Sequence, residues 1–348
     1  MFKYVFIIFI FFIISFTFKP KSEVYQFPIL ENFPKMPQNT NNIVTIEGAN
    51  LGRYLFYDNI LSKNNSLSCS SCHIQKFAFS DSLNQFSKGI NGVLTNRNTL
   101  PLFNLAWYPR LFWDGKVETI EDQIFHPVKN PNEMGLTWKE AAEKISNNKF
   151  YAKQFKIVFG NRVIDSVLIT NAIAQFLRTL ISNNSKFDRV LIGKDYFTAD
   201  EYKGFELVND MTKGDCLHCH TTDNNALGTN GKFSNNGLDN IQNPILFLDK
   251  GFGAITNNLS DYGKFKTPSL RNLSFTAPYM HDGRFKTLEE VLDFYSEGVQ
   301  NSINLDDKMG LVHDRVKLSK EEKKQIIAFL KTLNDSSFVK NSKYSNPF

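Results

Sequence analysis

The chain has 348 residues, 42% of them hydrophobic, and a formal net charge of +5 at neutral pH. This length suits two domains of ordinary size, with enough apolar residues to fill both cores. Three of the lysines and no acidic residue fall within residues 1–22, so a chain trimmed there is only slightly basic. Such a balance gives no indication of nucleic-acid binding.

The first 18 residues predict an exported protein. Lys3 precedes an apolar run that begins at Tyr4 and is interrupted only by Ser15 and Thr17. This is the pattern of a secretory signal peptide. The run is shorter than the roughly 20 apolar residues of a membrane-spanning helix. We therefore expect a signal peptide at residues 1–18 and a periplasmic mature chain, attached to the membrane only if the segment stays uncleaved.

Each half of the chain carries a motif that predicts a covalently attached c-type haem. Two thiols about one helical turn apart can add to the two haem vinyl groups, and a histidine directly after the second thiol can reach the iron. A zinc site would need a second ligand pair at finger-like spacing, and a redox CxxC pair does not require the histidine. The two motifs, CSSCH and CLHCH, consist of Cys69, Cys72 and His73 and of Cys216, Cys219 and His220.

Matching elements around the two motifs indicate an internal duplication. Amphipathic stretches that predict helices precede the motifs at residues 52–56 and 204–208. Each half closes on a second predicted helix, with the related sequences FLRTL at 176–180 and FLKTL at 329–333. Helix, haem motif, loops and closing helix therefore occur twice.

This order of elements predicts a mainly α fold of two tandem cytochrome c-type domains with little sheet. We place the N-terminal haem domain at residues 42–185 and the C-terminal haem domain at 198–335, with the link near 183–197. The stretches 76–118 and 221–263 are rich in Asn, Gly, Ser and Asp. Such stretches predict long loops that wrap the haems.

The segment after the first motif resembles the bacterial di-haem cytochrome c peroxidase and MauG family, and the resemblance extends from about residue 43 to residue 333. In FWDGKVETIEDQIFHPVKNPNEMG, three residues lie ten apart: Trp113, Gln123 and Glu133. The resemblance implies that Trp113 is an electron relay between the haems and that Gln123 and Glu133 line the peroxide side of the first haem. A buried carboxyl suits that place, because bound peroxide must lose a proton at one oxygen and gain one at the other. Taken singly, a solvated carboxylate and a core tryptophan are the plain alternatives.

The loop at residues 87–98 contains no histidine, whereas the main peroxidase branch of the family caps the first iron with a histidine from this loop. The resemblance therefore implies a first haem that is permanently five-coordinate and reacts with peroxide without reductive activation. His126 lies near the peroxide side by sequence and could intrude as a ligand. A packed or hydrogen-bonded loop residue is the simpler interpretation of this histidine.

The segment TPSLRNLSFTAPYMHDG at residues 267–283 is a second family signature, and fourteen residues after its His281 the chain has Tyr295. The main peroxidase branch has an axial methionine at that position, and the MauG branch has an axial tyrosine. Tyr295 is therefore the expected ligand of the second iron, with Met280 and Met309 as rivals and a hydrogen-bonded core tyrosine as the plain alternative. A phenolate is a hard anion that favours ferric or higher iron.

The resemblance also implies a calcium ion between the haems. Its protein ligands would be the side chain of Asn98 and the carbonyl oxygens of Thr276 and Pro278, residue types that the chain has at these positions. Oxygen ligands from both halves suit a hard cation.

Three functions remain open at this point. The leading hypothesis is a periplasmic peroxidase that reduces hydrogen peroxide at the first haem, with electrons entering through the second haem from a small cytochrome c or a cupredoxin. The second is MauG-like oxidation of side chains in a partner protein, which Tyr295 and the missing distal histidine favour. The third is a non-catalytic di-haem electron carrier.

Overall fold

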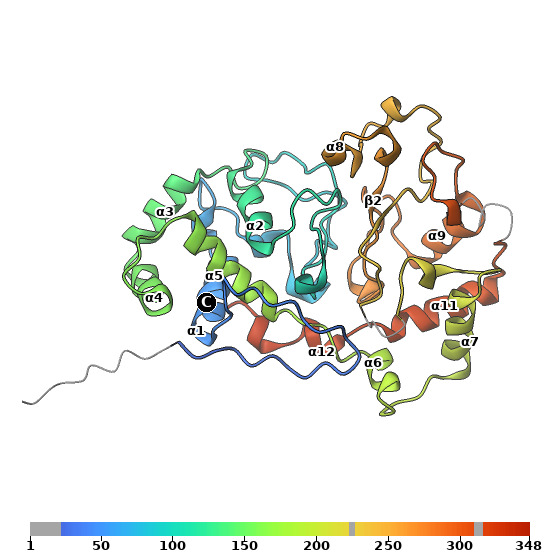
Figure 1. Ribbon diagram of the computed structural model, residues 1–348, viewed down its shortest axis with the longest axis horizontal. Coiled ribbons are helices and arrows are strands. Elements are labelled where there is room, and N and C mark those ends of the chain that lie inside the picture. Colours follow the sequence, from blue (N-terminus) through green and yellow to red (C-terminus); the bar gives the residue numbers. More distant parts are fainter. Residues whose placement is uncertain (1–21, 223–226, 310–315) are drawn as a thin grey trace, which may run out of the picture.

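The computed structural model describes residues 22–222, 227–309 and 316–348, and it is mainly helical (Figure 1). The two-stranded sheet of β1 (Phe233–Ser234) and β2 (Phe265–Lys266) is antiparallel and pairs Phe233 with Lys266. The prediction of a mainly α fold with little sheet is confirmed. The predicted signal peptide lies outside the described residues. Within the described ranges, no helix is both long and apolar enough to cross a membrane.

The helices form two groups in space, which follow the two halves of the sequence except that α6 packs in the core of the second group and α12 in the core of the first (Figure 1). Those of the first half are α1 (Ile46–Tyr57), α2 (Ile120–Lys129), α3 (Trp138–Asn147), α4 (Lys149–Phe159), α5 (Ser166–Thr179) and α6 (Lys186–Leu191). Those of the second half are α7 (Ala199–Asn209), α8 (Gly253–Thr256), α9 (Leu288–Asp293), α11 (Lys320–Thr332) and α12 (Ser336–Val339). A π-helical segment, η9 (Phe294–Gly298), continues α9.

Many of the segments between the α-helices contain a single 3₁₀ turn, and one such turn lies at each haem motif. The turns are η1 (Asn59–Leu61), η2 (Cys69–Ser71), η3 (Gln75–Phe77), η4 (Leu105–Trp107), η5 (Cys216–His218), η6 (Pro244–Leu246), η7 (Leu259–Asp261), η8 (Leu273–Phe275) and η10 (Ser342–Tyr344). The backbone of each haem motif is therefore folded in the same way, with two cysteines flanking one tight turn.

The two opening helices pack on the two closing helices through a glycine in each half. A Cβ atom added to Gly52 of α1 would lie 2.0 Å from the carbonyl oxygen of Ala172 in α5, and one added to Gly204 of α7 would lie 2.0 Å from that of Gln325 in α11. Real Cβ atoms do not approach a carbonyl so closely, so only glycine permits these crossings. The same contact recurs in both halves, which is the structural counterpart of the repeated sequence.

The C-terminal segment leaves the second half and packs on the first. Phe338 of α12 and Tyr344 are buried in the core that α1 and α5 build, with Phe338 only 2% exposed. The Arg53 side chain donates a hydrogen bond to the carbonyl of Ser345, and the Tyr57 hydroxyl donates one to the carbonyl of Tyr344. In Figure 1 the chain accordingly ends beside α1.

The N-terminal segment before α1 also joins the halves. The ring of Phe33 lies 5.6 Å from that of Trp107 in the first half and 5.5 Å from the guanidinium of Arg271 in the second. Arg271 is fully buried and forms a two-pronged ion pair with Asp188 of α6, at 2.5 and 2.9 Å. The N-terminal segment, the C-terminal segment and α6, the helix between the halves, thus hold the two halves together.

Gly204→Ala is expected to destabilise the second half by about 2 kcal/mol or more. A Cβ atom 2.0 Å from a backbone oxygen lies at the upper end of overpacking, which costs about 3 kcal/mol or more, and the gain in helix propensity is at most about 1 kcal/mol. Urea unfolding followed by circular dichroism measures the change. Tyr202→Ala, at a 55% exposed position of the same helix, is the control and should shift stability by less than about 0.5 kcal/mol. Equal midpoints for the two variants would contradict the close crossing of α7 and α11.

Candidate functional site

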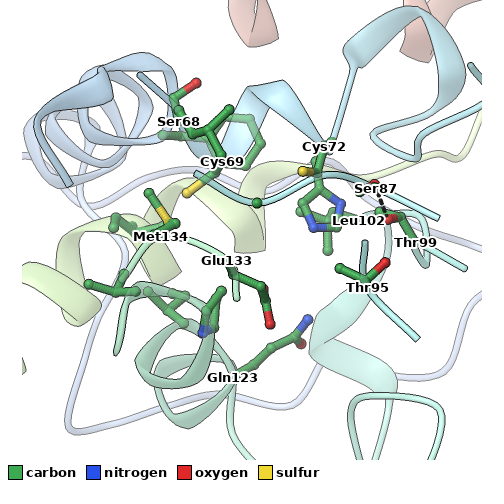
Figure 2. Close-up of a pocket in the computed structure, with 18 of the residues that line it drawn as sticks. Ser68, Cys69, Cys72, Ser87, Thr95, Thr99, Leu102, Gln123, Glu133 and Met134 are labelled. Carbon is green, nitrogen blue, oxygen red and sulfur yellow. Dashed lines mark hydrogen bonds between the residues drawn. The ribbon is translucent and has the colours of Figure 1, made fainter. Parts of the chain in front are cut away.

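A cavity lies beside the first haem motif, with about 830 Å³ of empty space that is partly continuous with solvent. Figure 2 shows the side chains of Cys69 and Cys72 on one side of this space and those of Gln123 and Glu133 pointing into it from the other. His73 also lines the cavity. The structure therefore brings together the first haem motif and the two residues that the sequence places on the peroxide side.

The four cysteines are unpaired and half-buried. Burial raises the pKa of Cys69 and of Cys216 to about 12 and the pKa of Cys72 and of Cys219 to about 11. Such thiols are protonated and neither bind metal nor exchange disulfides readily. The raised pKa values of these thiols therefore suit thioether attachment of a haem better than redox chemistry.

The first histidine is held by a strained turn. His73 Nδ1 lies 2.8 Å from the carbonyl oxygen of Phe79, which fixes the tautomer that leaves Nε2 for iron. Ala78 and Phe79 both have left-handed backbone conformations, with φ of 53° and 60°. Such conformations persist only where packing enforces them, and the Phe79 ring is clamped between Phe56 and Phe338. The C-terminal segment thus supports the proximal side of the first haem site.

The opposite wall of the cavity carries an unsatisfied polar atom. Gln123 lies on α2, and its Oε1 is buried without a hydrogen-bond partner among the described residues. An unpaired buried carbonyl oxygen costs about 1–3 kcal/mol, so a hydrogen-bond donor in the cavity would stabilise it. A protonated ligand on the iron side of the cavity supplies such a donor, and the residues present therefore fit a haem with an open coordination position.

Glu133 is oriented by its own loop. Asn130 Nδ2 donates a hydrogen bond to Glu133 Oε1 at 2.7 Å, and the Glu133 carbonyl accepts one from the backbone N–H of Ile90 at 2.9 Å. The second bond ties Glu133 to the loop at residues 87–98, which lines the cavity through Ser87, among others. Glu133 Oε1 is therefore anchored, whereas Oε2 accepts no hydrogen bond from the described residues.

His126 takes no part in the cavity wall. It lies on α2, half-buried, and its ring meets the ring of Phe112 edge to face at 5.6 Å. Burial and the nearby Lys116 and Lys129 lower the pKa of His126. This arrangement agrees with the interpretation of His126 as a packed residue.

Trp113 lies at the interface between the halves. Its side chain is 8% exposed, and Nε1 donates a hydrogen bond to the carbonyl of Asn98 at 2.8 Å. Its own carbonyl accepts a hydrogen bond from the backbone N–H of Lys266 in the second half. Its ring lies 6.5 Å from that of His281, which stacks on Phe265 at 3.6 Å. The tryptophan is therefore in contact with both halves.

The three residues implied as calcium ligands lie at the same interface. The Asn98 backbone N–H donates to the carbonyl of His281 at 2.8 Å, which joins Asn98 to the segment that contains Thr276 and Pro278. Asn98 Nδ2 donates to the carbonyl of Gln85, so the amide oxygen is the atom left for another partner. Asn98 and Thr276 are both buried. The oxygen types fit a hard cation.

The second haem motif has the same histidine support as the first. His220 Nδ1 lies 2.9 Å from the carbonyl oxygen of Pro268, which leaves Nε2 for iron. Burial lowers the pKa of His220 to about 4, so the imidazole is neutral, as a metal ligand must be. His218 is the spacer residue within the 3₁₀ turn η5.

All three candidates for the second axial ligand meet in one cluster. Tyr295 lies on the π-helical segment η9, and its hydroxyl accepts a hydrogen bond from Asn236 Nδ2 at 3.1 Å. The same amide lies 3.6 Å from Met280 Sδ. Met309 packs in the same hydrophobic cluster as both. The structure thus gathers the expected ligand and its rivals around Asn236, a residue that sequence reasoning missed.

The phenol of Tyr295 lies near the thiols of the second haem motif. Its pKa is raised to about 12, chiefly by burial, and the nearby Cys216 and Cys219 contribute to the increase. The helix that leads to it begins with the capping box of Thr287 and Glu290. Phe294, next in line, is buried in the cluster. The phenol therefore lies inside the second half, on a π-helical segment that continues a capped helix.

Comparison with known proteins gives consistent matches. A family model described as di-haem cytochrome c peroxidase matches residues 46–196. The chain is similar to the methylamine utilization protein MauG of Methylophilus methylotrophus, with 31% identity over 301 residues that cover 86% of each chain. It is also similar to cytochrome c551 peroxidase of Nitrosomonas europaea, with 33% identity over 306 residues, 87% of this chain and 84% of that one. The solved structure of a MauG-like protein associated with microbial copper homeostasis has a TM-score of 0.84 and 33% identity, over 93% of this chain and 99% of that chain.

Removing one pair of thiols is expected to remove one haem. Mass spectrometry of the exported protein should show two haem adducts in the wild type, one in the Cys69→Ala/Cys72→Ala variant and one in the Cys216→Ala/Cys219→Ala variant. The reason is that each thioether pair has no substitute, since the four cysteines are all in the two motifs. Two adducts in either double variant would contradict the assignment.

Proposed function

The chain belongs to the di-haem cytochrome c peroxidase and MauG family of oxidoreductases, and from this we propose that it reduces hydrogen peroxide at the haem site of His73. Electrons would arrive through the haem site of His220 from a small cytochrome c or a cupredoxin in the periplasm. The observation that carries the proposal is the cavity wall opposite His73, where the unpaired Gln123 Oε1 and the carboxyl of Glu133 face the haem motif.

The distal residues have separate tasks in this proposal. The haem, when bound, supplies the iron that takes up peroxide and the electrons that break the O–O bond. Gln123 Oε1 accepts a hydrogen bond from the substrate and orients it. Glu133 takes a proton from one peroxide oxygen and delivers it to the other, while Asn130 holds the carboxylate in place. The proximal imidazole of His73 is kept in one tautomer by Phe79.

Trp113 is proposed as the relay between the haems. Its indole N–H is held by Asn98, and its carbonyl by Lys266, so the ring has a fixed orientation between the two haem sites. A fixed, buried aromatic ring suits electron transfer because little needs to reorganise when charge passes. The proposed calcium ion, bound by Asn98, Thr276 and Pro278, would hold the same interface together because its ligands come from both halves.

MauG-like oxidation of a partner protein is the second candidate, and the surroundings of Tyr295 favour it. The phenol oxygen accepts a hydrogen bond from Asn236 beside the second haem motif. We propose Tyr295 as the axial ligand of that haem. Because a phenolate favours ferric and higher iron, a haem so ligated holds an oxidising equivalent better than it stores an electron.

Turnover with reduced cytochrome c and hydrogen peroxide separates the two activities. A peroxidase is expected to turn over briskly. An enzyme that oxidises a partner protein is expected to turn over slowly and to keep a long-lived oxidised state after peroxide is added. A non-catalytic carrier would show neither, and no high-spin ferric haem in its electron paramagnetic resonance spectrum.

Glu133→Gln is expected to slow the reaction of the ferric protein with hydrogen peroxide by about 10²–10⁴-fold, because the amide cannot shuttle a proton. Stopped-flow absorbance of the haem bands measures the rate. Glu143→Gln, at an exposed position of α3, is the matched control and should react at the wild-type rate. A wild-type rate for Glu133→Gln would exclude Glu133 from proton transfer.

Tyr295→Met is expected to raise the reduction potential of the second haem, because a thioether favours ferrous iron and a phenolate favours ferric iron. Spectroelectrochemical titration of the two haems measures the potentials, and the same change at the 82% exposed Tyr196 is the control. An unchanged spectrum and potential in Tyr295→Met would remove the phenolate from the iron and leave Met280 or Met309 as the ligand.

A further inference from the structure

A buried lysine lies between the halves and forms no ion pair within residues 22–222, 227–309 and 316–348. Lys266 is 5% exposed, and its Nζ lies 4.5 Å from the centroid of the Tyr108 ring. The carboxylate of Asp114 favours its charged form. That carboxylate is already engaged, because it accepts hydrogen bonds from the guanidinium of Arg97 at 2.7 Å and from the backbone N–H of Lys116.

An ammonium in such a place is costly. Moving an unpaired charge out of water carries a large desolvation penalty, and contact with one aromatic ring offsets only part of it. Burial accordingly lowers the pKa of Lys266 to about 7. A methionine or leucine would fill the same space without this cost, so the residue calls for an anionic partner.

The backbone places Lys266 on a direct connection between the relay and the second haem site. Its N–H donates to the carbonyl of Trp113 at 2.9 Å. Two residues further along the same extended segment, the carbonyl of Pro268 holds His220 Nδ1. Tyr108, under the ammonium, belongs to the first half, and its half-buried side chain lies within hydrogen-bond reach of Ser269 in this segment. The ammonium is therefore near the interface side of the haem site of His220.

We propose that the ammonium of Lys266 binds a carboxylate side chain of the haem attached at Cys216 and Cys219, at the interface beside Trp113. A haem carries carboxylates at the edge of its ring, and these are anions that need a partner when the edge is buried. A lysine is a compact point charge that suits a single carboxylate oxygen. The inference rests on the proposed haem at His220, and it does not depend on the reaction at the first haem.

The pair has a consequence for the electron-entry side of the protein. A positive charge beside a haem carboxylate cancels a negative charge close to the iron, which favours the ferrous state. Lys266 is thus a positioning residue that sets both the haem edge next to Trp113 and the ease with which that haem accepts an electron. It acts through the haem carboxylate and has no part in the chemistry at the peroxide site.

Lys266→Met tests the pair, because it keeps the length of the side chain and removes the charge. At a fixed applied potential, the ferric-to-ferrous ratio of the second haem is expected to rise about tenfold or more, the effect of losing one unit charge close to the carboxylate. Resonance Raman bands of the haem carboxylates should shift in the same sample. Lys266→Arg keeps the charge and should restore both properties.

Lys250→Met is the matched control, since Lys250 Nζ lies 5.0 Å from the ring of Tyr262 but at an exposed position. It should leave the potential and the Raman bands unchanged. Lys266→Gln provides a second neutral variant if Lys266→Met does not accumulate, and it is expected to raise the ferric-to-ferrous ratio in the same direction. Wild-type carboxylate bands and potential in a neutral variant that retains both haems would overturn the pair.

The same measurements separate this inference from the proposed function. A wild-type protein without peroxide turnover would contradict the function, yet the potential of its second haem would still report on Lys266. A shift confined to the first haem would overturn the assignment of the carboxylate to the haem at His220.

Discussion

Two backbone hydrogen bonds across the interface set how the halves meet. One runs from Asn98 to the carbonyl of His281, and the other from Lys266 to the carbonyl of Trp113. Each hydrogen bond joins one half to the other. Asn98 also holds the Trp113 indole N–H, so both hydrogen bonds involve residues that fix Trp113. Because electron transfer between two haems depends steeply on their separation, such contacts do more for function than an equal number of contacts within one core. The chain ends reinforce them, since Phe33 and Phe338 each cross from one half to the other.

The two haem sites share a proximal design and differ on the distal side. In both, a buried histidine is held at Nδ1 by a carbonyl, that of Phe79 or that of Pro268. Opposite the first histidine lie polar groups around a cavity, among them the unpaired oxygen of Gln123. At the second site a packed cluster of aromatic and sulfur-containing side chains includes Tyr295. A duplicated fold has thus become one site with a cavity beside the haem motif and one with a packed cluster that includes the candidate ligands.

The sequence was most informative where a chemical requirement fixes spacing. The haem motifs and the repeated helices follow from local patterns, and the glycines of those helices meet the same backbone contact in both halves. Residues that act through distant contacts carry no such signal. The carbonyl of Phe79 is aimed by a ring from the other end of the chain, Phe338, and the amide of Asn236 lies in an irregular loop. The π-helical turn at Tyr295 was equally hidden, since it lies at the end of the helix and no helical residues follow in which a shifted apolar pattern could be seen.

The amide of Asn236 offers a physical reason to prefer the phenol over the thioether at the second haem. Its N–H reaches both the oxygen of Tyr295, at 3.1 Å, and the sulfur of Met280, at 3.6 Å. Oxygen is the stronger acceptor, and a phenolate oxygen is stronger still, whereas a thioether gains little from the bond. A donor at this place therefore stabilises the anionic ligand selectively. This selectivity favours an oxygen ligand, and with it a second haem adapted to hold oxidising equivalents.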